Sequence, residues 1–255
     1  MNLKKERQTA ILAAKEAEKA INKYYGKHEK AKVKPNNSLV GIADIESNKA
    51  IIRIIRKNFP DHSILSEESP FENNHSDFKW VLDPVDGTHN FLHNIPIFGT
   101  SIALEYKNEV VLGLLNFPAL GMTAIAEKGK GAFVNGKKIR VSNKDSLEHA
   151  FVLFEFSYAN RKEKTDFLEK LIHEAIDVRN FGSAIYHLLL IACGKSDGFV
   201  ILSTNEWDVA AGILLVEEAG GKITDLKGNK YNLNEHKFII SNGKIHGKLI
   251  ELAKS

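Results

Sequence analysis

The sequence predicts an α+β fold, a layered αβαβα sandwich made of an antiparallel sheet and a second mixed sheet with helices. Two helical patterns open the chain, several runs of strand character follow, and strands alternate with helices after about residue 150. We assign residues 1–150 to N-terminal helices and an antiparallel sheet with a metal-binding loop. Residues 151–255 form a C-terminal α/β half, and we expect the two halves to make one structural unit.

The first two helices follow from hydrophobic periodicity. A long amphipathic pattern covers about residues 4–25 and stops at Gly26, a residue that commonly ends helices. A second helix begins near Asp44. Four of its apolar residues are expected to face a core: Ile45, Ile51, Ile52 and Ile55.

The central part of the first half is predicted to be an antiparallel meander. A short strand at Ser63–Ser66 ends at Glu67-Glu68, and residues 71–78 form a polar loop that we expect to be mobile. Whether this loop covers a site is open. The meander itself consists of three strands and two turns: Gly99–Tyr106, Lys107-Asn108, Glu109–Leu115, Met122–Ala126 and Gly129–Gly131.

The second half alternates strand and helix patterns, which is typical of an α/β layer. The expected strands are Ala150–Phe154, Asp177–Asn180, Asp197–Leu202, Lys222–Thr224 and Phe238–Ser241. The expected helices are Arg161–His173, Ser183–Cys193, Asp208–Ala219 and Gly243–Ala253.

Composition excludes several classes of protein. The chain has 255 residues, 43% hydrophobic and 26% charged, and a net charge of +3, which is too small to indicate a nucleic-acid polymer as partner. It has no apolar run long enough to enter a membrane, and the N-terminal residues lack a signal peptide's apolar stretch. The single Cys193 cannot form an internal disulfide and is expected to pack as an apolar residue. We therefore expect a cytoplasmic protein.

The segment Asp83-Pro84-Val85-Asp86-Gly87-Thr88 is the most informative one. It follows the apolar run Trp80-Val81-Leu82, so it is predicted to leave a buried strand as an acidic loop. Asp83 and Asp86 can point at the same small volume, where their like charges require a cation or a proton. Carboxylate, hydroxyl and carbonyl oxygens suit Mg²⁺. An ordinary structural turn is the alternative interpretation.

Three further carboxylates are candidate companions of this loop. Glu67 ends an apolar strand, Asp208 stands at the start of a strongly apolar helix, and Asp44 begins the second helix. Taken alone, Asp44 and Asp208 are as well explained as helix N-caps, and Glu67 as a solvated strand end.

In this order the motifs resemble those of the inositol monophosphatase superfamily, which are Mg²⁺-dependent, lithium-sensitive phosphomonoesterases. The resemblance extends over nearly the whole chain. Beyond the carboxylates, it rests on Asn90-Phe91, His93, Ile95-Pro96, Lys128-Gly129-Lys130-Gly131-Ala132-Phe133, Trp207-Asp208-Val209-Ala210-Ala211-Gly212 and Glu218-Ala219-Gly220-Gly221. It implies a homodimer that acts on a small phosphorylated sugar or polyol.

The resemblance also implies roles for individual residues. Two or three Mg²⁺ ions are expected. The first would bind Glu67, Asp83, the Val85 carbonyl and the Thr88 hydroxyl, and the second would bind Asp83, Asp86 and Asp208. A weaker third ion would bind Glu67 near Asp44. Catalysis is expected to involve Asp44, Thr88 and Glu67, with Thr88 and Asp44 positioning the attacking water. Substrate contacts are expected from the N–H groups of Gly87 and Thr88, and from Gly182 and Ser183, for which a plain helix start is the alternative.

The substrate stays open within the superfamily. Where the family carries an Asp and a Thr before Asp44, this chain has Ser38 and Gly41, and Ile201 replaces a Glu that meets sugar hydroxyls. Inositol 1-phosphate is the leading substrate. Fructose 1,6-bisphosphate is the alternative, as is adenosine 3′,5′-bisphosphate, because Glu206-Trp207-Asp208 resembles the nucleotidase branch. His89 is either a substrate-side group or a surface ring. A non-catalytic regulator is the remaining alternative, against which the intact acidic set argues.

Overall fold

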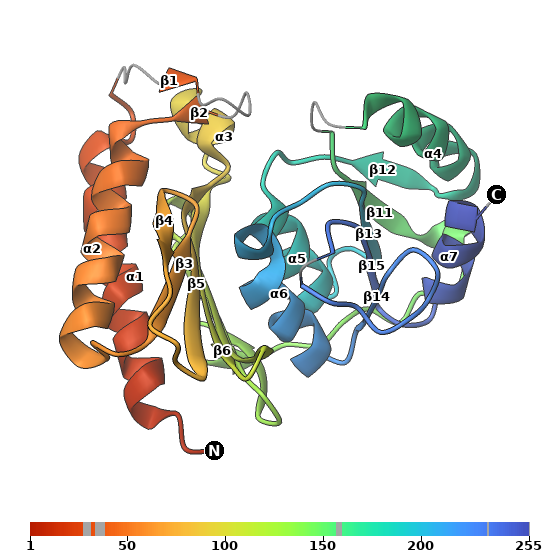
Figure 1. Ribbon diagram of the computed structural model, residues 1–255. Helices are drawn as coiled ribbons and strands as arrows, with labels where there is room; N and C mark the ends of the chain where they lie inside the picture. The colour runs from red at the N-terminus through yellow and green to blue at the C-terminus, as the bar shows by residue number, and fades with distance from the viewer. Residues whose placement is uncertain (28–31, 34–38, 157–159, 234, 255) are drawn as a thin grey trace.

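The computed structural model describes residues 1–27, 32–33, 39–156, 160–233 and 235–254. Five layers follow one another across the molecule (Figure 1), in the order α1 and α2, a large sheet, α5 and α6, a small sheet, α4 and α7. The predicted αβαβα sandwich is therefore confirmed. The helices are α1 (Lys4–Tyr24), α2 (Ile42–Asn58), α3 (Thr88–Leu92), α4 (Arg161–Glu174), α5 (Ala184–Ala192), α6 (Glu206–Glu218) and α7 (His246–Lys254), with 3₁₀ turns at Pro118–Leu120 and Leu147–His149.

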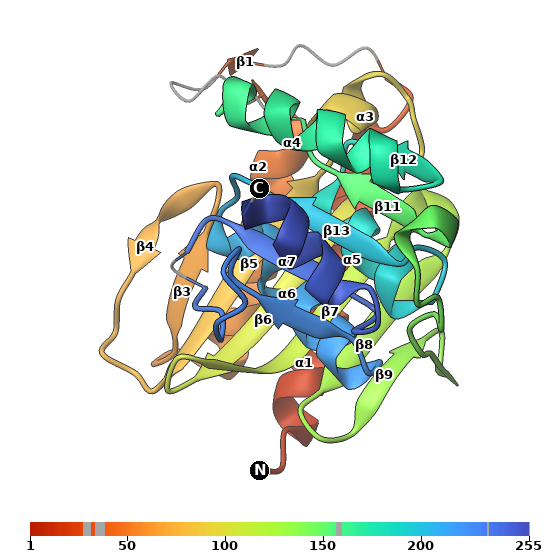
Figure 2. The same cartoon turned by 90° about the vertical axis from the view of Figure 1, so that its right-hand side faces the viewer.

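The large sheet has eight strands in the order β10-β9-β8-β7-β6-β5-β3-β4. All neighbours are antiparallel except β3 and β5, which run parallel. Figure 2 shows these strands side by side from β4 to β9. They are β3 (Ser63–Ser66), β4 (Ser69–Glu72), β5 (Phe78–Asp86), β6 (Gly99–Tyr106), β7 (Glu109–Phe117), β8 (Met122–Glu127), β9 (Gly131–Val134) and β10 (Lys137–Lys138).

The small sheet is mixed, as predicted. Its order is β12-β11-β13-β15-β14, with parallel pairs around β11 and antiparallel pairs around β15. The strands are β11 (Phe151–Phe154), β12 (Asp177–Arg179), β13 (Gly198–Ile201), β14 (Lys222–Thr224) and β15 (Phe238–Ser241). A short antiparallel pair, β1 (Lys32–Val33) and β2 (Leu39–Val40), precedes α2.

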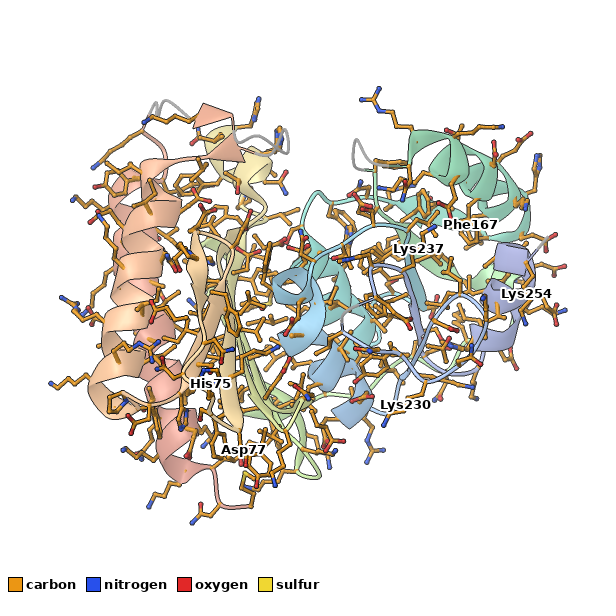
Figure 3. All side chains as sticks on the ribbon, viewed as in Figure 1. His75, Asp77, Phe167, Lys230, Lys237 and Lys254 are labelled. Atoms are coloured by element: carbon orange, nitrogen blue, oxygen red, sulfur yellow. The ribbon has the colours of Figure 1, made fainter. Side chains whose placement is uncertain are left out.

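The segment predicted as a loop at 71–78 is partly a strand. Its first two residues end β4, where Glu72 accepts a 3.0 Å hydrogen bond from Arg56 Nε on α2. Polar residues are tolerated there because β4 is an edge strand with one side free. His75 and Asp77 lie at the end of the sheet where β5 starts, away from α3 (Figure 3). The strand length from Phe78 to Asp86 is roughly 26 Å, so residues 73–77 do not cover the acidic loop.

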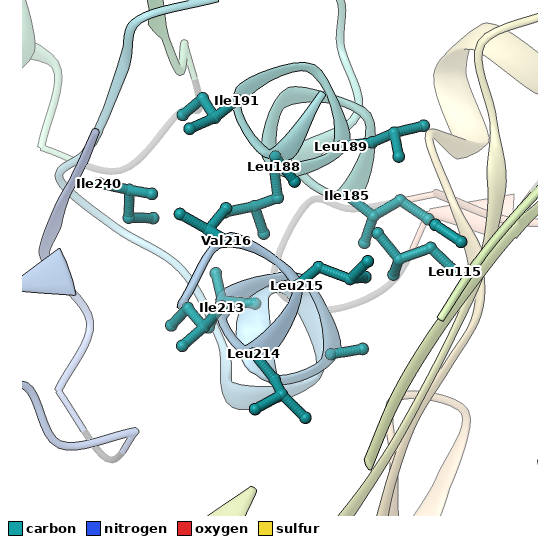
Figure 4. Close-up of a cluster of buried hydrophobic side chains, with 14 of the residues drawn as sticks. Leu115, Ile185, Leu188, Leu189, Ile191, Ile213, Leu214, Leu215, Val216 and Ile240 are labelled. Atoms are coloured by element: carbon teal, nitrogen blue, oxygen red, sulfur yellow. The ribbon is translucent and has the colours of Figure 1, made fainter. Parts of the chain in front are cut away.

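Helix α6 forms the centre of the molecule because its sequence is apolar on every side, as expected for a helix buried between two sheets. Figure 4 shows its side chains Ile213, Leu214, Leu215 and Val216 packed in one cluster with α5. The backbones also approach closely. A Cβ added to Gly113 of β7 would lie 2.5 Å from the carbonyl oxygen of Ala211.

The C-terminal end of α6 is tied to the turn between β8 and β9. Both carboxylate oxygens of Glu218 accept hydrogen bonds from this turn, from Gly129 N–H and Gly131 N–H, each at 2.6 Å. The turn predicted at Gly129–Gly131 is thus confirmed as a turn, and it also fixes one end of the central helix.

On α2 one expectation is wrong. Ile51 and Ile55 are buried and Ile52 is partly buried, but Ile45 is 42% exposed. At 100° per residue, Ile45 points about 120° away from Ile51 and in nearly the same direction as Ile52, so it lies on the flank of the helix rather than on its buried face, and one helical turn nearer the N-terminus this flank is left uncovered. Along the residues described, no helix combines the length and apolar character needed to span a bilayer.

Candidate metal centre

The acidic loop turns sharply at the end of β5. Gly87 has φ +83°, in the left-handed region, and a Cβ there would lie 2.7 Å from the carbonyl oxygen of Ile97. Glycine is therefore required for this turn. Inside the loop, Val85 N–H donates to Asp83 Oδ1 at 3.0 Å and the Thr88 hydroxyl donates to the Val85 carbonyl at 3.1 Å. These bonds orient the oxygen atoms of the loop.

Three of the predicted ligands converge. Among the residues that the structure describes, Asp83, Asp86 and Asp208 each offer a carboxylate oxygen, and these oxygens lie within 4.8 Å of one another. Asp83 and Asp86 come from β5, and Asp208 comes from the first turn of α6. Because the three oxygens surround one small volume, the group could hold a divalent cation.

The electrostatics of this group also favour a cation. Burial, together with the charges of Glu67, Asp86 and Asp208, raises the pKa of Asp83 well above its ordinary value. Burial and the charge of Asp208 raise the pKa of Asp86 to about 7, although the hydrogen bond from Ser183 opposes this shift. Burial and Glu67 raise the pKa of Asp208 to about 6. A bound cation would remove this repulsion and restore the charged carboxylates.

Asp44 lies beside the loop and is 1% exposed. Its Oδ2 accepts from Gly41 N–H at 3.0 Å, and its Oδ1 accepts from the Thr88 hydroxyl at 3.2 Å. Burial, with the charges of Glu68 and Glu67, raises the pKa of Asp44 to about 7, even though the hydrogen bond from Gly41 opposes the shift. Asp44 is thus the third residue of α2, close to the predicted helix start, and not its N-cap, which is Gly41. It is also a neighbour of Thr88. Ser38 lies outside the described residues.

Glu67 follows the last residue of β3, and its N–H donates to the Leu82 carbonyl at 3.2 Å. It is not one of the three convergent aspartates. Because β3 runs parallel to β5 and Ser66 is paired with Leu82, Glu67 lies beside Asp83 at the same end of the sheet. Its charge also raises the pKa of Asp83, Asp208 and Asp44. The five predicted carboxylates therefore gather at one end of the large sheet.

Asp208 is held by the residues just before it. Its Oδ2 accepts from Asn205 N–H at 2.8 Å, from the Thr204 hydroxyl at 3.0 Å and from Asn205 Nδ2 at 3.3 Å. Asp208 is therefore not the N-cap of α6, which is Asn205. It is the third residue of the helix, closes a capping box with Asn205, and also belongs to the cluster. The contributions of Thr204 and Asn205 were not predicted from the sequence.

Ser183 contacts the cluster directly. It is the N-cap of α5, and its hydroxyl donates to Asp86 Oδ2, while Ala184 and Ile185 N–H lie 3.3 Å from the Asp86 carboxylate. The first turn of α5 thus stabilises a negative charge on Asp86. Sequence reasoning placed Ser183 at the leaving group instead, because nothing local in the sequence links it to Asp86.

Asn90 joins the acidic loop to the turn before α5. It is 8% exposed, and its Nδ2 donates to the carbonyls of Phe181 at 2.7 Å and Ile97 at 2.8 Å. Gly182, at φ +70°, packs against it, since a Cβ there would lie 3.2 Å from the Asn90 amide. Asn90 stood out in the sequence as part of the motif Asn90-Phe91. The two carbonyl groups that accept its hydrogen bonds could not be predicted from the sequence.

Two other residues discussed from the sequence are not among the three convergent aspartates. His89 is exposed, and its carbonyl oxygen is 2.8 Å from His93 Nδ1. Both interpretations of its ring, as a substrate-side group and as a surface ring, stay predictions. Ile201 is 1% exposed and packs in the central core, so it offers no polar contact to a sugar.

Comparison with known proteins identifies the family. The profile of the inositol monophosphatase family matches residues 2–255. A fructose-1,6-bisphosphatase/inositol-1-monophosphatase of Thermotoga maritima is 42% identical over 209 residues, covering 82% of this chain and 80% of that protein. The Nus factor SuhB of Escherichia coli is 36% identical over 225 residues, covering 86% and 84%.

Solved structures agree with this result. The suppressor protein SuhB of Bartonella henselae superposes with a TM-score of 0.93 at 33% identity, covering 98% of both chains. An IMPase of Thermotoga maritima superposes with a TM-score of 0.91 at 36% identity, covering 98% of this chain and 96% of that one. The resemblance deduced from the motifs is confirmed, and the chain belongs to the inositol monophosphatase family.

Proposed function

We propose that this chain is a Mg²⁺-dependent phosphatase that hydrolyses a monoester of a small sugar or polyol phosphate. The observation that carries the proposal is the convergence of Asp83, Asp86 and Asp208 within 4.8 Å. All three ligands are oxygens, and their like charges lie close together and repel one another, which fits a hard divalent ion. A group of oxygen ligands for a divalent cation also fits the relatives of this chain that are named as phosphatases.

Two ion sites can be assigned to these oxygens. One uses Glu67, Asp83, the Val85 carbonyl and the Thr88 hydroxyl, and the other uses Asp83, Asp86 and Asp208. A third, weaker ion beside Glu67 and Asp44 completes the proposal. When bound, such ions make a water molecule more acidic and stabilise charge on the attacking and leaving oxygens.

The protein residues orient the reactants. The Thr88 hydroxyl has one proton and two acceptors within reach, the Val85 carbonyl at 3.1 Å and Asp44 Oδ1 at 3.2 Å. When it donates to Asp44, a lone pair of its oxygen remains to accept a hydrogen bond from the attacking water. The water proton can then pass towards the Asp44 carboxylate. The N–H groups of Gly87 and Thr88 are proposed to hold the phosphate, because a left-handed Gly before a short helix exposes them to an anion.

On the leaving-group side, the roles of Gly182 and Ser183 differ. Gly182 is exposed beside Asn90 and is available to a substrate. The Ser183 hydroxyl is engaged with Asp86, so we propose that it orients this ligand rather than the leaving group.

Inositol 1-phosphate is the leading substrate and fructose 1,6-bisphosphate the second. The second candidate is favoured by the names of relatives from Thermotoga maritima and Aquifex aeolicus, which combine both activities. The buried apolar Ile201 does not favour a polyol over other leaving groups. The homodimer and the cytoplasmic location stay predictions.

A substrate panel tests the proposal. Phosphate release is measured from inositol 1-phosphate, fructose 1,6-bisphosphate and adenosine 3′,5′-bisphosphate, with Mg²⁺ or with a chelator. We expect Mg²⁺-dependent release from at least one of the first two. Release from the nucleotide alone would favour the nucleotidase alternative. No release from any of them, by protein that binds Mg²⁺, would favour a regulator.

A further inference from the structure

Three ionisable side chains meet between the large sheet and α6, on the same two elements that carry Asp83 and Asp208. Lys79 Nζ of β5 lies 2.5 Å from Glu206 Oε1 of α6 and 3.0 Å from Glu105 Oε2 of β6. The side chains are largely shielded from water, with exposed fractions of 22% for Lys79, 12% for Glu206 and 3% for Glu105. None of these residues belongs to the proposed metal sites.

The geometry relates this ion-pair group to the cluster. Lys79 precedes Asp83 by four residues, so both side chains leave β5 on the same face. Val81, between them, packs in the core cluster that contains α6. Glu206 precedes Asp208 by two residues in the first turn of α6. The Lys79–Glu206 ion pair and the Asp83–Asp208 pair therefore connect the same two elements.

We propose that Lys79 is a positioning residue for the metal centre: its ion pairs hold the first turn of α6 against β5 and thereby set the spacing between Asp83 and Asp208. This inference rests on the proposed metal-dependent function. A restraint of this kind is useful because Asp83, Asp86 and Asp208 repel one another and would push α6 away from β5. The attraction of Lys79 for Glu206 opposes that movement.

The charges of the group are consistent with this role. Burial alone would lower the pKa of Lys79, but the hydrogen bond from Lys79 to Glu206 and the charge of Glu105 outweigh it and raise the pKa. Lys79 is therefore positively charged near neutral pH. Burial and the neighbouring Glu206 raise the pKa of Glu105 to about 7. Removing Lys79 would leave these two carboxyl groups facing each other without a cation, so the attraction that holds Glu206 to β5 would be lost.

The direction in which the cation affinity changes when Lys79 is neutralised distinguishes a positioning role from a purely electrostatic effect. Lys79 is a positive charge on the same strand face as Asp83, so its charge alone disfavours cation binding, however weakly, and never favours it. Neutralising it would strengthen binding if electrostatics were its only influence. If Lys79 positions the ligands, neutralising it weakens binding instead.

The experiment uses Mn²⁺ as the probe, titrated into the full chain and followed through the EPR signal of the free ion. Lys79→Met is expected to weaken Mn²⁺ binding by about tenfold, the lower end of the range for groups that orient metal ligands. Lys79→Arg keeps the cation and is expected to restore most of the affinity. If Lys79→Met does not fold, Lys79→Gln provides the same neutralisation with a hydrogen-bond donor retained.

Arg56→Met is the matched control, because it breaks another ion pair of the large sheet, with Glu72, away from the cluster. It is expected to lower thermal stability and leave Mn²⁺ affinity unchanged. Equal or tighter Mn²⁺ binding by the neutral Lys79 variants would overturn the positioning role while the proposed function stands. Failure of the wild-type chain to bind Mn²⁺ would overturn the proposed function itself.

Discussion

Ser183 donates its hydroxyl to Asp86 although the two residues are 97 positions apart in the sequence. This bond connects the end of β5 to the N-terminus of α5, and so it links the acidic loop to the middle helical layer. The hydroxyl hydrogen bond lowers the pKa of Asp86 and opposes the effect of burial. It therefore helps to keep Asp86 in the charged form that binds a cation.

Ser183→Ala should weaken Mg²⁺ activation by about tenfold, as expected for a group that orients a metal ligand. The activity profile should also shift to higher pH, because Asp86 loses a donor that favours its charged form. Both effects are measured from initial rates across a Mg²⁺ and pH series. Ser183→Thr retains the hydroxyl and is the control. An unshifted pH profile for Ser183→Ala would show that the bond serves α5 capping alone.

Asp83→Asn should lower turnover by roughly a thousandfold or more, since both proposed ions lose a shared ligand. The same change should raise the thermal stability of the metal-free protein at pH 8, because it removes a buried carboxylate that four neighbouring carboxylates repel. Phosphate release and thermal unfolding measure the two effects. Near wild-type turnover would refute the assignment of the loop as the metal site.

Metal-free protein should lose stability as pH rises from about 4 towards 7. Asp44, Asp86 and Asp208 have an ordinary pKa of 3.8, which folding raises to about 7, 7 and 6. Between these values the folded state binds more protons than the unfolded state, so stability falls with rising pH.

Added Mg²⁺ should compensate for this loss, and the stabilisation by Mg²⁺ should grow between pH 5 and pH 8. The measurement is the difference in melting temperature with Mg²⁺ and with a chelator at each pH. Buried His187 and His246 have pKa values lowered by burial to about 3 and 4, but their effect is present in both samples and cancels. A difference that does not change with pH would contradict this account of the cluster.

Gly87→Ala should both destabilise the fold and abolish the acidic loop geometry. Gly26 provides a matched control: its φ of +79° resembles the +83° of Gly87, but no atom lies within 4 Å of an added Cβ. Gly26→Ala should cost about 1–2 kcal/mol from the left-handed backbone alone. Gly87→Ala should cost a further 1–3 kcal/mol or so from overpacking against Ile97. Urea unfolding of both variants measures the difference, and equal losses would exclude the steric explanation.

Much of the architecture could be predicted because its signals are local. Alternation identified β6, β7 and β8, and the apolar sequence around Asp208 identified the buried helix α6. The edge strand β4 was missed because it is short, contains Pro70 and shows no apolar alternation, and because its pairing depends on β3. Ile45 was assigned to the wrong face because apolar character alone does not fix the direction of a side chain around a helix.

For the candidate site, the sequence revealed the acidic residues but not the contacts that hold them. Asp83 and Asp86 are close in sequence, and the family motifs placed Asp208 with them. The bonds from Ser183 to Asp86 and from Lys79 to Glu206 join residues about a hundred positions apart. Such pairs depend on how the layers pack, and no periodicity or local spacing encodes them.

The tether between Glu218 and the β8–β9 turn has a consequence for distant mutations. A helix of this length is about 20 Å long and, enclosed along its flanks, it moves as a rigid rod rather than bending. Loosening its far end would therefore displace Asp208 at the other end. Substitutions at Gly129 or Gly131 should consequently alter cation affinity without contacting any ligand.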